Sequence, residues 1–523
     1  MTFKKKDRKT AQSGATEEVT SALGTSSRRG FLRSGAGLVA GAAASQLLPT
    51  SSVTAQQNGA NAGMAQALRA ANTSGRPILL KDGMVLSMDP QVGDFQKADI
   101  LIQGKKIMSV GPNAEAPKSA LVVNAAGMIV MPGFIDTHHH QYETLLRAEV
   151  ADSIVPVAVE APPKNNYTSV IGGIFTPFYT PDDARLAELL ASVSQLAAGV
   201  ITTVDTSQVQ LSPEHTDACL EGLKQSGRRC QFNYGASGKD AATRTPMELM
   251  RLKKQYFASN DQLLTLSSGG AGGPDGWKYV RSLGIPIVTH IVGDNTMGTL
   301  QRYADAGVMG PDCEYIHCTR LSETMWKKIA DTGGKVSIAA AIEMQMQHGL
   351  PPFQQAIDHG IRPSLSVDVE CNMTADLFTV MRAAYLCQRA LANERIIVAE
   401  KNAPRLLTCR EAIEFGTIAG AKATHLDAKI GSLTPGKEAD IIMLATDKIN
   451  VMVTNNVPGV VVTLMDTSNV EHVFVAGKVM KWQGTMVGLD LNKLRQDCNR
   501  AVDGLFERSK FPRDLFGSCC ITT

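Results

Sequence analysis

The sequence has few aromatic residues, with 15 Phe, 9 Tyr and 3 Trp among 523 residues, and many glycines. This balance disfavours a protein built from a β-sandwich alone and favours an α/β fold with tight loops. No apolar run predicts a membrane span, because the candidate at 35–48 is short and rich in glycine. The ten cysteines include no CxxC pair, so we expect mainly reduced, structural cysteines rather than a disulfide framework.

The chain carries almost no net charge, but its N-terminus is locally basic. Residues 1–55 contain eight Lys and Arg against three Asp and Glu, a net charge of +5, so the remaining residues carry −3. A mildly acidic body gives no reason to expect a nucleic-acid partner. The N-terminal segment has the order of a twin-arginine signal: the pair Arg28-Arg29, then Phe31-Leu32, then a short apolar stretch. We therefore expect export to the periplasm by the twin-arginine machinery and no stable membrane span.

The patterns after this segment divide the chain into several regions. Residues 56–77 are rich in Gln, Asn, Ala and Gly and predict a linker. Strand-like alternation over 78–130 returns over 430–487, where one strand is expected at 460–465. We expect these two flanks to pair into one small discontinuous β-sandwich. Residues 488–523 predict a helix followed by a tail.

Residues 131–429, between the two flanks, alternate between buried strand patterns and amphipathic helices. The first strand of this region ends at Asp136. Later strands are predicted at 200–205, 230–235, 263–268, 285–290, 313–318, 335–341 and 362–368. Eight β/α units in sequence favour a (β/α)8 TIM barrel over an open sheet.

Four of the predicted strand ends carry side chains that bind metals. Strand one ends in DTHHH, and an extended segment turns His138 and His140 to one side and the histidine between them to the other. Strand five ends at His290, strand six at His317 and strand eight at Asp368. Catalytic groups of such barrels lie at this face, and imidazoles with a carboxylate suit Zn²⁺ with a position left for water. We assign no metal role to the histidines elsewhere in the chain, which are His215, His348, His359, His425 and His472.

The segments GFIDTHHH, IVTH, IHC and SVD, in this order, resemble the metal-dependent amidohydrolase superfamily, as does GSLTPGKEADIIML. The resemblance covers about 78–487 and points to the branch of triazine hydrolases and cytosine deaminase-like enzymes, with the phrases EMQMQHG and SLSVDV. It implies that His138, His140, His290 and Asp368 bind the metal, zinc or iron. It also implies that Asp368 accepts a proton from the attacking water and that His317 hydrogen-bonds this water or the substrate oxygen.

Two absences refine what the resemblance implies. Two-metal members of the superfamily carry a carbamylated lysine at the end of strand four, where this chain has L-S-S-G-G, so we expect one divalent ion. Deaminase-like members carry a glutamate three residues after the strand-five histidine, where this chain has Gly293. Asp294 and Glu343 are candidates to replace that acid. Asp368 alone can transfer the proton when an amide, carbamate or amidine-like bond is hydrolysed. This kind of hydrolysis is therefore favoured over deamination.

Three further residues are candidate contacts of a small-molecule substrate: Gln141, Glu143 and Arg320, the last for an anionic group. An ordinary loop position or ion pair is the alternative for each. The leading hypothesis is a metal-dependent hydrolase of a C–N bond in a small non-peptide molecule. The alternatives are a heterocycle aminohydrolase, a hydrolytic dehalogenase, and a periplasmic ligand-binding protein on an inactive scaffold. The sequence leaves homo-oligomerisation open.

Overall fold

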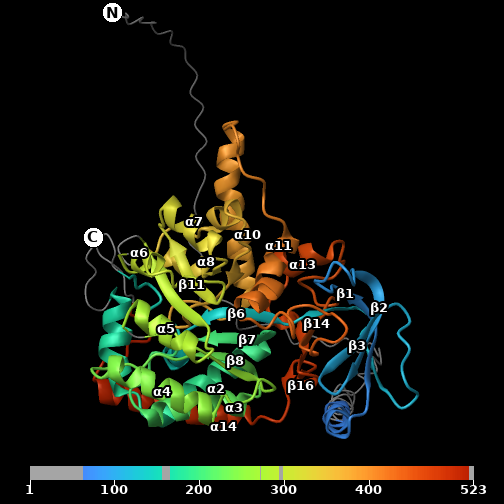
Figure 1. The fold of residues 1–523 in the computed structure, drawn as a ribbon. Helices are drawn as coiled ribbons and strands as arrows, with labels where there is room; N and C mark the ends of the chain where they lie inside the picture. The colour runs from blue at the N-terminus through green and yellow to red at the C-terminus, as the bar shows by residue number, and fades with distance from the viewer. Residues whose placement is uncertain (1–62, 156–164, 271, 294–297, 518–523) are drawn as a thin grey trace, which may run out of the picture. The chain divides into compact units, whose positions relative to one another are not determined.

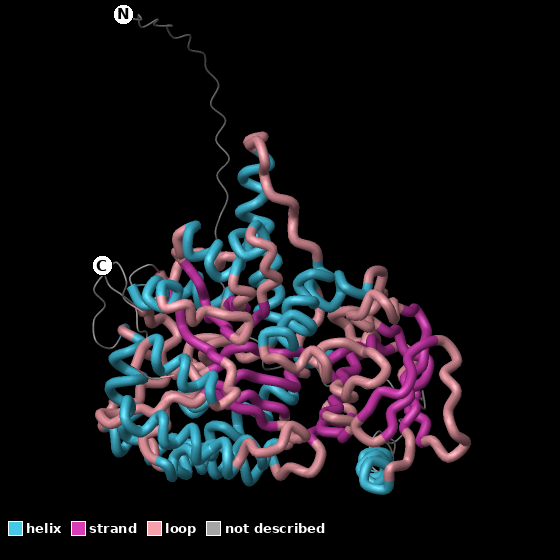
Figure 2. The backbone as a smooth tube through the Cα atoms, viewed as in Figure 1, coloured by secondary structure: helices cyan, strands magenta, loops and turns pink. Residues whose placement is uncertain are grey.

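The structure is a computed structural model that describes residues 63–155, 165–270, 272–293 and 298–517. All eight predicted barrel strands are present, with helices around them (Figures 1 and 2). The strands are β6 (Phe134–His139), β7 (Val200–Asp205), β8 (Arg229–Asn233), β9 (Leu264–Ser267), β10 (Ile287–Val292), β11 (Cys313–Thr319), β12 (Lys335–Ile338) and β13 (Ser364–Leu365). The predicted (β/α)8 architecture is confirmed, although β13 is shorter than its predicted range.

The barrel wall consists of two four-stranded parallel sheets, β6–β7–β8–β9 and β10–β11–β12–β13. At the first junction between them the amide of Ser268 donates to the carbonyl of Pro286 over 3.0 Å. At the second, the amide of Asp368 donates to the carbonyl of His138 over 2.9 Å, and the amide of His140 donates to the carbonyl of Asp368 over 2.7 Å. The second junction therefore places Asp368 beside the histidines of the first strand.

The helices that cover the barrel begin where the sequence carries capping signals. At α2, the Thr180 hydroxyl accepts from the amide of Asp183 and the Asp183 carboxylate accepts from the amide of Thr180, with Pro181 at the first helical position. The side chains of Ser212 and Asp376 cap α3 and α10 by accepting from the amides of His215 and Thr379. The helices are α2 (Pro181–Ala197), α3 (Pro213–Ser226), α4 (Ala241–Gln255), α5 (Pro274–Ser282), α6 (Gly298–Asp305), α7 (Glu323–Asp331), α8 (Ala340–Gln345), α9 (Phe353–Asp358) and α10 (Leu377–Ile397).

The interior of the barrel is partly apolar and partly polar. Val204, Val288 and Ile316 form an apolar cluster of their own, separate from the larger core under the helices. Beside it, the Thr137 hydroxyl is hydrogen-bonded to the hydroxyls of Ser337 and Ser364, at 2.7 and 2.8 Å. A polar interior of this kind can hold charged side chains near the catalytic face.

The two flanks form one nine-stranded sheet, in which antiparallel pairing of β5 with β14 joins the N-terminal and C-terminal parts. Side chains from strands near both ends of this sheet, such as Ile100 and Phe474, pack together in one core. The sheet therefore folds over on itself around that core. The strands are β1 (Ile78–Val85), β2 (Phe95–Gln103), β3 (Lys106–Gly111), β4 (Leu121–Asn124), β5 (Met128–Pro132), β14 (Ile441–Ala445), β15 (Val470–Val475), β16 (Lys478–Trp482) and β17 (Thr485–Met486). The predicted pairing of the flanks is present.

Two local predictions were wrong. Residues 63–74, inside the predicted linker, form a helix whose Leu68 and Ala71 are buried in the core of the β domain. Residues 460–465, predicted as a strand, lie mostly in helix α13 (Val457–Thr463). The Asn456 side chain caps this helix by accepting from the amide of Gly459 over 2.7 Å, and burial of its valines overrides their preference for strands.

The C-terminal part of the described chain completes the barrel. Three short helical segments, α11 (Cys409–Glu414), η6 (Phe415–Ala419) and α12 (Gly420–Ala423), follow α10, and a longer helix, α14 (Leu491–Ser509), contacts α2. Of the eight cysteines in the described ranges, six are buried and all eight are free. Among the described helices, none combines the length and the apolar character that a bilayer crossing requires.

Candidate metal centre

The His triplet divides between two sides of strand β6. His138 and His140 both face the catalytic side, since the Nε2 atom of each lies near Asp368 Oδ1. The His139 ring lies on the other side, with its nitrogens 3.7 Å from Asp136 Oδ2 and 3.9 Å from Glu370 Oε2. All three rings are buried. The structure therefore separates the triplet as the alternation of an extended segment predicts.

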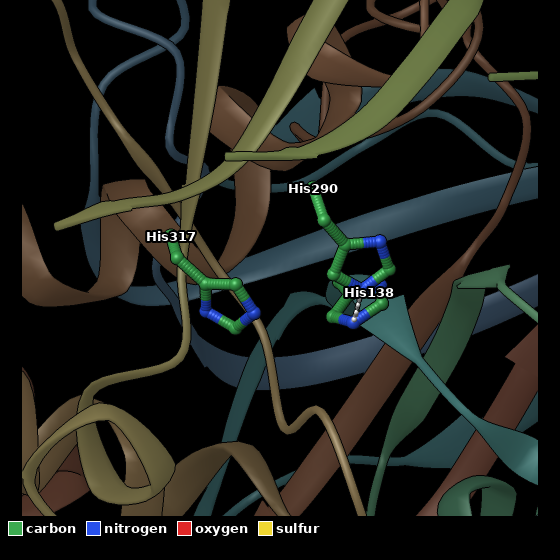
Figure 3. A group of neighbouring side chains, drawn as sticks. All are labelled: His138, His290 and His317. Carbon is green, nitrogen blue, oxygen red and sulfur yellow. Dashed lines mark hydrogen bonds between the residues drawn. The ribbon is translucent and has the colours of Figure 1, made fainter. Parts of the chain in front are cut away.

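Four of the predicted metal ligands meet at one point. His138 Nε2 lies 3.0 Å from Asp368 Oδ1 and 3.1 Å from His290 Nε2, and His140 Nε2 lies 3.5 Å from Asp368 Oδ1. Figure 3 shows His138 and His290 with their ring nitrogens facing each other and His317 beside them. His138, His140 and Asp368 form one group that could hold a metal ion, and His138, His290 and His317 form another.

The chemistry of this donor set fits a cation. His140 Nδ1 lies 2.8 Å from the carbonyl of Thr206, which can only accept, so this nitrogen carries the proton. Burial lowers the pKa of His140 to about 3, so the ring is neutral and its Nε2 presents a lone pair. That lone pair faces the Asp368 carboxylate, another acceptor, at 3.5 Å. Two hydrogen-bond acceptors this close in a buried site have no donor between them, and a divalent ion placed there would satisfy both.

The neighbouring groups set the charge of the centre. Burial lowers the pKa of His138 and, with the other imidazoles around it, lowers that of His290 well below its usual value. For Asp368 burial acts in the opposite direction, but the hydrogen bond from His138 and the charge of His317 hold its pKa well below the usual range. At neutral pH the centre therefore offers neutral imidazoles and one ionised carboxylate, which is the protonation state that binds zinc.

His317 is held by a carboxylate behind it. Its Nδ1 lies 3.1 Å from Glu343 Oε1, and the same oxygen accepts from the amide of Ala339 over 2.9 Å. Its Nε2 lies 3.8 Å from Asp368 Oδ2. Burial disfavours the charged ring of His317, but Glu343 and Asp368 outweigh burial and raise its pKa. Glu343 therefore orients His317, and its role as a replacement for the missing strand-five glutamate stays a prediction.

Both His317 and Asp368 adopt left-handed backbone conformations, with φ of 73° and 68°. Such conformations cost of order 1–3 kcal/mol for residues with a side chain and persist where the surroundings enforce them. Their occurrence at two strand ends that aim ligands at one point is typical of a functional site.

Sequence patterns missed a set of supporting residues. Thr206, just after β7, binds His140 through its carbonyl, and its hydroxyl lies 3.2 Å from His138 Nδ1. The Asn233 amide donates to the Thr206 hydroxyl over 3.3 Å, and the Ser267 hydroxyl donates to Asn233 over 3.2 Å. A signal existed, since each of these polar residues stands at or next to the end of a predicted barrel strand. Contacts of this kind fix the tautomer and orientation of metal-binding imidazoles.

The predicted substrate contacts next to the triplet have other partners. Gln141 is fully buried, and its side chain donates to Glu188 Oε2 over 2.8 Å and accepts from Arg228. Helix η1 (Gln141–Leu146) begins at this residue and directs its side chain into a polar network under α2. The prediction of Gln141 as a substrate contact was therefore wrong.

Glu143, also in helix η1, is fully buried beside the centre. Its carboxyl accepts from the Tyr167 hydroxyl over 2.5 Å and from the Cys371 thiol over 2.9 Å. Burial raises its pKa to about 8, and the charge of Asp368 acts in the same direction. The carboxyl of Glu143 is therefore largely protonated at neutral pH, and its role as a substrate contact stays a prediction.

The remaining candidates lie around strands β11 and β12. Arg320 is exposed, and its Nε donates to the carbonyl of His348 over 2.9 Å. Asp294 lies outside the described residues. His348, to which the sequence analysis assigned no metal role, is brought to the centre: its ring centroid is 4.7 Å from that of His317, and His317, His348 and Asp368 form a third candidate metal group. The prediction that His348 has no metal role stays a prediction, and no periodic pattern in the sequence signals its place beside His317.

Several curated proteins are similar to this chain over most of its length. The curated relatives include a 5'-deoxyadenosine deaminase of Methanosarcina barkeri, 24% identical over 455 residues, which cover 82% of this chain and 99% of the relative. They also include a 5-methylthioadenosine/S-adenosylhomocysteine deaminase of Pelotomaculum thermopropionicum, 24% identical over 454 residues, with coverage of 82% and 99%.

Solved structures share the fold. A zinc-bound adenosine deaminase from Xanthomonas campestris aligns with a TM-score of 0.70 and 18% identity, covering 82% of this chain and 98% of the other. The zinc complex of an atrazine chlorohydrolase from Arthrobacter aurescens aligns with a TM-score of 0.70 and 20% identity, covering 81% and 100%. The model of the amidohydrolase family matches residues 129–480, which span the barrel and the strands that flank it. The chain therefore belongs to the amidohydrolase family and is a hydrolase of carbon–nitrogen bonds other than peptide bonds.

Proposed function

We propose that this protein is an exported zinc hydrolase that cleaves an amide, carbamate or amidine-like C–N bond in a small non-peptide molecule. The observation that carries the proposal is the meeting of neutral imidazole nitrogens with one ionised carboxylate at the catalytic face of the barrel. His138, His140, His290 and Asp368 would hold the ion. When bound, zinc acts as a Lewis acid that lowers the pKa of water towards neutrality and polarises a substrate oxygen.

The residues of the chain would carry the proton transfers. Asp368, ionised because of its lowered pKa, accepts a proton as a water oxygen bonds to the electrophilic carbon. The same carboxyl then returns the proton to the leaving nitrogen, the C–N bond breaks, and an amine or ammonia departs. His317, held in place by Glu343, donates a hydrogen bond to the substrate oxygen on which negative charge develops.

Deamination of a heterocycle is the second candidate, and the names of the curated relatives favour it, since those described above are deaminases of adenosine derivatives. The same ligands would serve that reaction. Deamination additionally requires a proton on a ring nitrogen, and Gly293 occupies the position of the glutamate that shuttles it in deaminase-like members. Hydrolytic dehalogenation is the third candidate, because the atrazine chlorohydrolase shares the fold.

Screening for the leaving group tests these alternatives. Purified protein loaded with zinc is incubated with amides, carbamates, aminopyrimidines, adenosine derivatives and chlorotriazines, and amine, ammonia and chloride are measured. We expect amine from an amide or carbamate; ammonia from a ring amine would favour deamination, and chloride would favour dehalogenation. Turnover of none of these by a zinc-loaded, folded protein would favour the ligand-binding alternative.

A matched pair of variants then tests the role of Asp368. Asp368→Asn removes the charge with little change in shape, and we expect kcat to fall at least about 10³-fold. His425→Asn, at an exposed position, is the control and should leave kcat unchanged. Activity that survives in Asp368→Asn at unchanged zinc content would overturn the assigned role. Absence of bound metal in protein purified without chelators would overturn the proposal as a whole.

Export by the twin-arginine route is the second part of the proposal and rests on the sequence of the N-terminal segment. Replacing Arg28 and Arg29 together by lysine keeps the charge but alters the pair that defines the signal. We expect the natural chain in the periplasmic fraction and the double variant in the cytoplasm of a bacterial host. Equal export of both chains would exclude this route.

A further inference from the structure

We propose that the substrate carries a carboxylate group and that Arg320 is the residue that binds it. The inference rests on the proposed function, because it names the class of molecule that the hydrolase would accept. It is carried by the place of the Arg320 guanidinium, which fills the space beside Gly293 that a side chain at that position would enter. The substrate class is therefore a small amide or carbamate with an acidic group, such as an N-acylated amino acid.

Gly293 leaves space for another side chain close to the candidate metal ligands. It stands three residues after His290, and its φ of 70° favours glycine. A Cβ at Gly293 would lie 2.9 Å from Arg320 Nη2 and 3.0 Å from Arg320 Cζ. Deaminase-like members of the family carry a glutamate at this position, whereas this chain presents the end of an arginine there. A cation therefore stands in the place of an acid.

The rest of the Arg320 side chain is held by the segment after α8. A Cβ at Gly349 would lie 3.0 Å from Arg320 Cγ and 3.4 Å from Arg320 Cδ, and the φ of 124° at Gly349 favours glycine. Arg320 Nε donates to the carbonyl of His348 over 2.9 Å. The arginine thus runs between two glycines with its Nε fixed, and its side chain is still exposed to solvent.

The backbone after strand β11 places Arg320 next to the candidate metal centre. Arg320 stands three residues after His317, and His317, Cys318 and Arg320 all have left-handed conformations, with φ of 73°, 55° and 58°. Such conformations persist where the surroundings enforce them, and they are concentrated at functional sites. On the other side, His348, whose carbonyl binds Arg320, has its ring centroid 4.7 Å from that of His317. Both contacts of the arginine therefore adjoin residues of the centre.

The guanidinium has donors left for an oxyanion. Within the described ranges Arg320 forms no ion pair with a carboxylate, and its hydrogen bond to His348 uses Nε alone. The terminal N–H groups of an arginine match the paired oxygens of a carboxylate and bind them in a planar fork. One cation balances the single charge of a carboxylate, so we assign this group rather than a doubly charged phosphate.

A matched pair of probes tests the proposal without turnover. Benzoate and nitrobenzene have the same shape, neither contains a hydrolysable C–N bond, and only benzoate is an anion. Their dissociation constants are measured by calorimetry with the zinc-loaded chain, and again with the chain stripped by a chelator, because a carboxylate also binds zinc directly. We expect the stripped chain to bind benzoate at least about 10-fold more tightly than nitrobenzene. Arg320→Gln should abolish this preference.

Two further variants separate binding from a structural role, with melting curves to show that each chain is folded. Arg320→Lys keeps the charge and should retain part of the preference for benzoate. Arg495→Gln, at an exposed position of α14, is the control and should bind both probes as the natural chain does.

The outcomes distinguish this inference from the proposed function. Equal affinities for the two probes in the natural chain overturn the inference and leave the proposed function standing. A preference for benzoate that survives in folded Arg320→Gln does the same. Absence of bound metal from the purified chain overturns the proposed function, whereas a preference for benzoate that depends on Arg320 would still assign the carboxylate site.

Discussion

Glu314, in strand β11, is a carboxyl buried in the barrel interior, and neither of its oxygens has a hydrogen-bond partner in the described part of the chain. Burial raises its pKa from 4.5 to about 8, although a contact with Thr137 acts in the opposite direction. A raised carboxyl pKa means that the folded chain binds the proton more tightly than the unfolded chain does. The stabilisation is fully present below the unfolded pKa of 4.5 and is lost as pH rises towards 8.

Glu314→Gln removes this dependence, because an amide of the same shape does not titrate. Each pKa unit corresponds to about 1.4 kcal/mol, so the natural chain should lose about 3 kcal/mol relative to the variant between about pH 5 and about pH 8. Denaturant unfolding of both chains at these two pH values measures the difference. Other titrating groups, the metal ligands included, contribute to both chains and cancel in the comparison.

Glu394→Gln provides the control, since this glutamate is exposed on α10 and the same change should have no such pH dependence. A stability difference between Glu314→Gln and the natural chain that is equal at both pH values would refute the reasoning. It would show that Glu314 is not buried as a neutral acid in the folded protein.

Three further outcomes are expected. Glu343→Gln should lower kcat/KM about 10- to 100-fold, because the carboxylate that orients His317 is lost; zinc content measured in parallel separates this from loss of the ion. Gly222→Ala should lower the free energy of unfolding by about 2 kcal/mol, since its Cβ would lie 2.3 Å from the carbonyl oxygen of Arg185. Gly172→Ala, which meets open space, should change it by less than about 1 kcal/mol in denaturant unfolding. Chelation should lower the melting temperature and added zinc should restore it, because the ion binds the folded chain; an unchanged melting curve would contradict the metal site.

The barrel and the candidate metal group that contains His138 and Asp368 could be predicted because local patterns determine them. Alternating strands and capped helices repeat in regular order, and His138, His290 and Asp368 stand at strand ends, where the topology of a barrel brings side chains together. The sequence shows how far a residue stands from the end of a predicted strand. The family resemblance added the order in which the ligands occur.

The parts that could not be predicted depend on contacts between distant segments. Gln141 follows the triplet directly, yet its side chain is bound by Glu188 and Arg228, which lie far along the chain. His348 reaches the centre through the path of the segment after α8, and no spacing rule fixes that path. The valines of α13 have the composition of a strand, and only their cap and their burial make them helical.

The two sheets of the barrel wall divide the candidate metal ligands between them. His138 and His140 belong to the first sheet, whereas His290, His317 and Asp368 come from the second. An ion held by residues of both sheets would therefore connect the two half-barrels, in addition to taking part in the reaction. Its removal would leave the mouth joined chiefly by backbone bonds such as those between Asp368 and strand β6. The residues proposed to perform the chemistry would therefore also help to keep the barrel closed at this face.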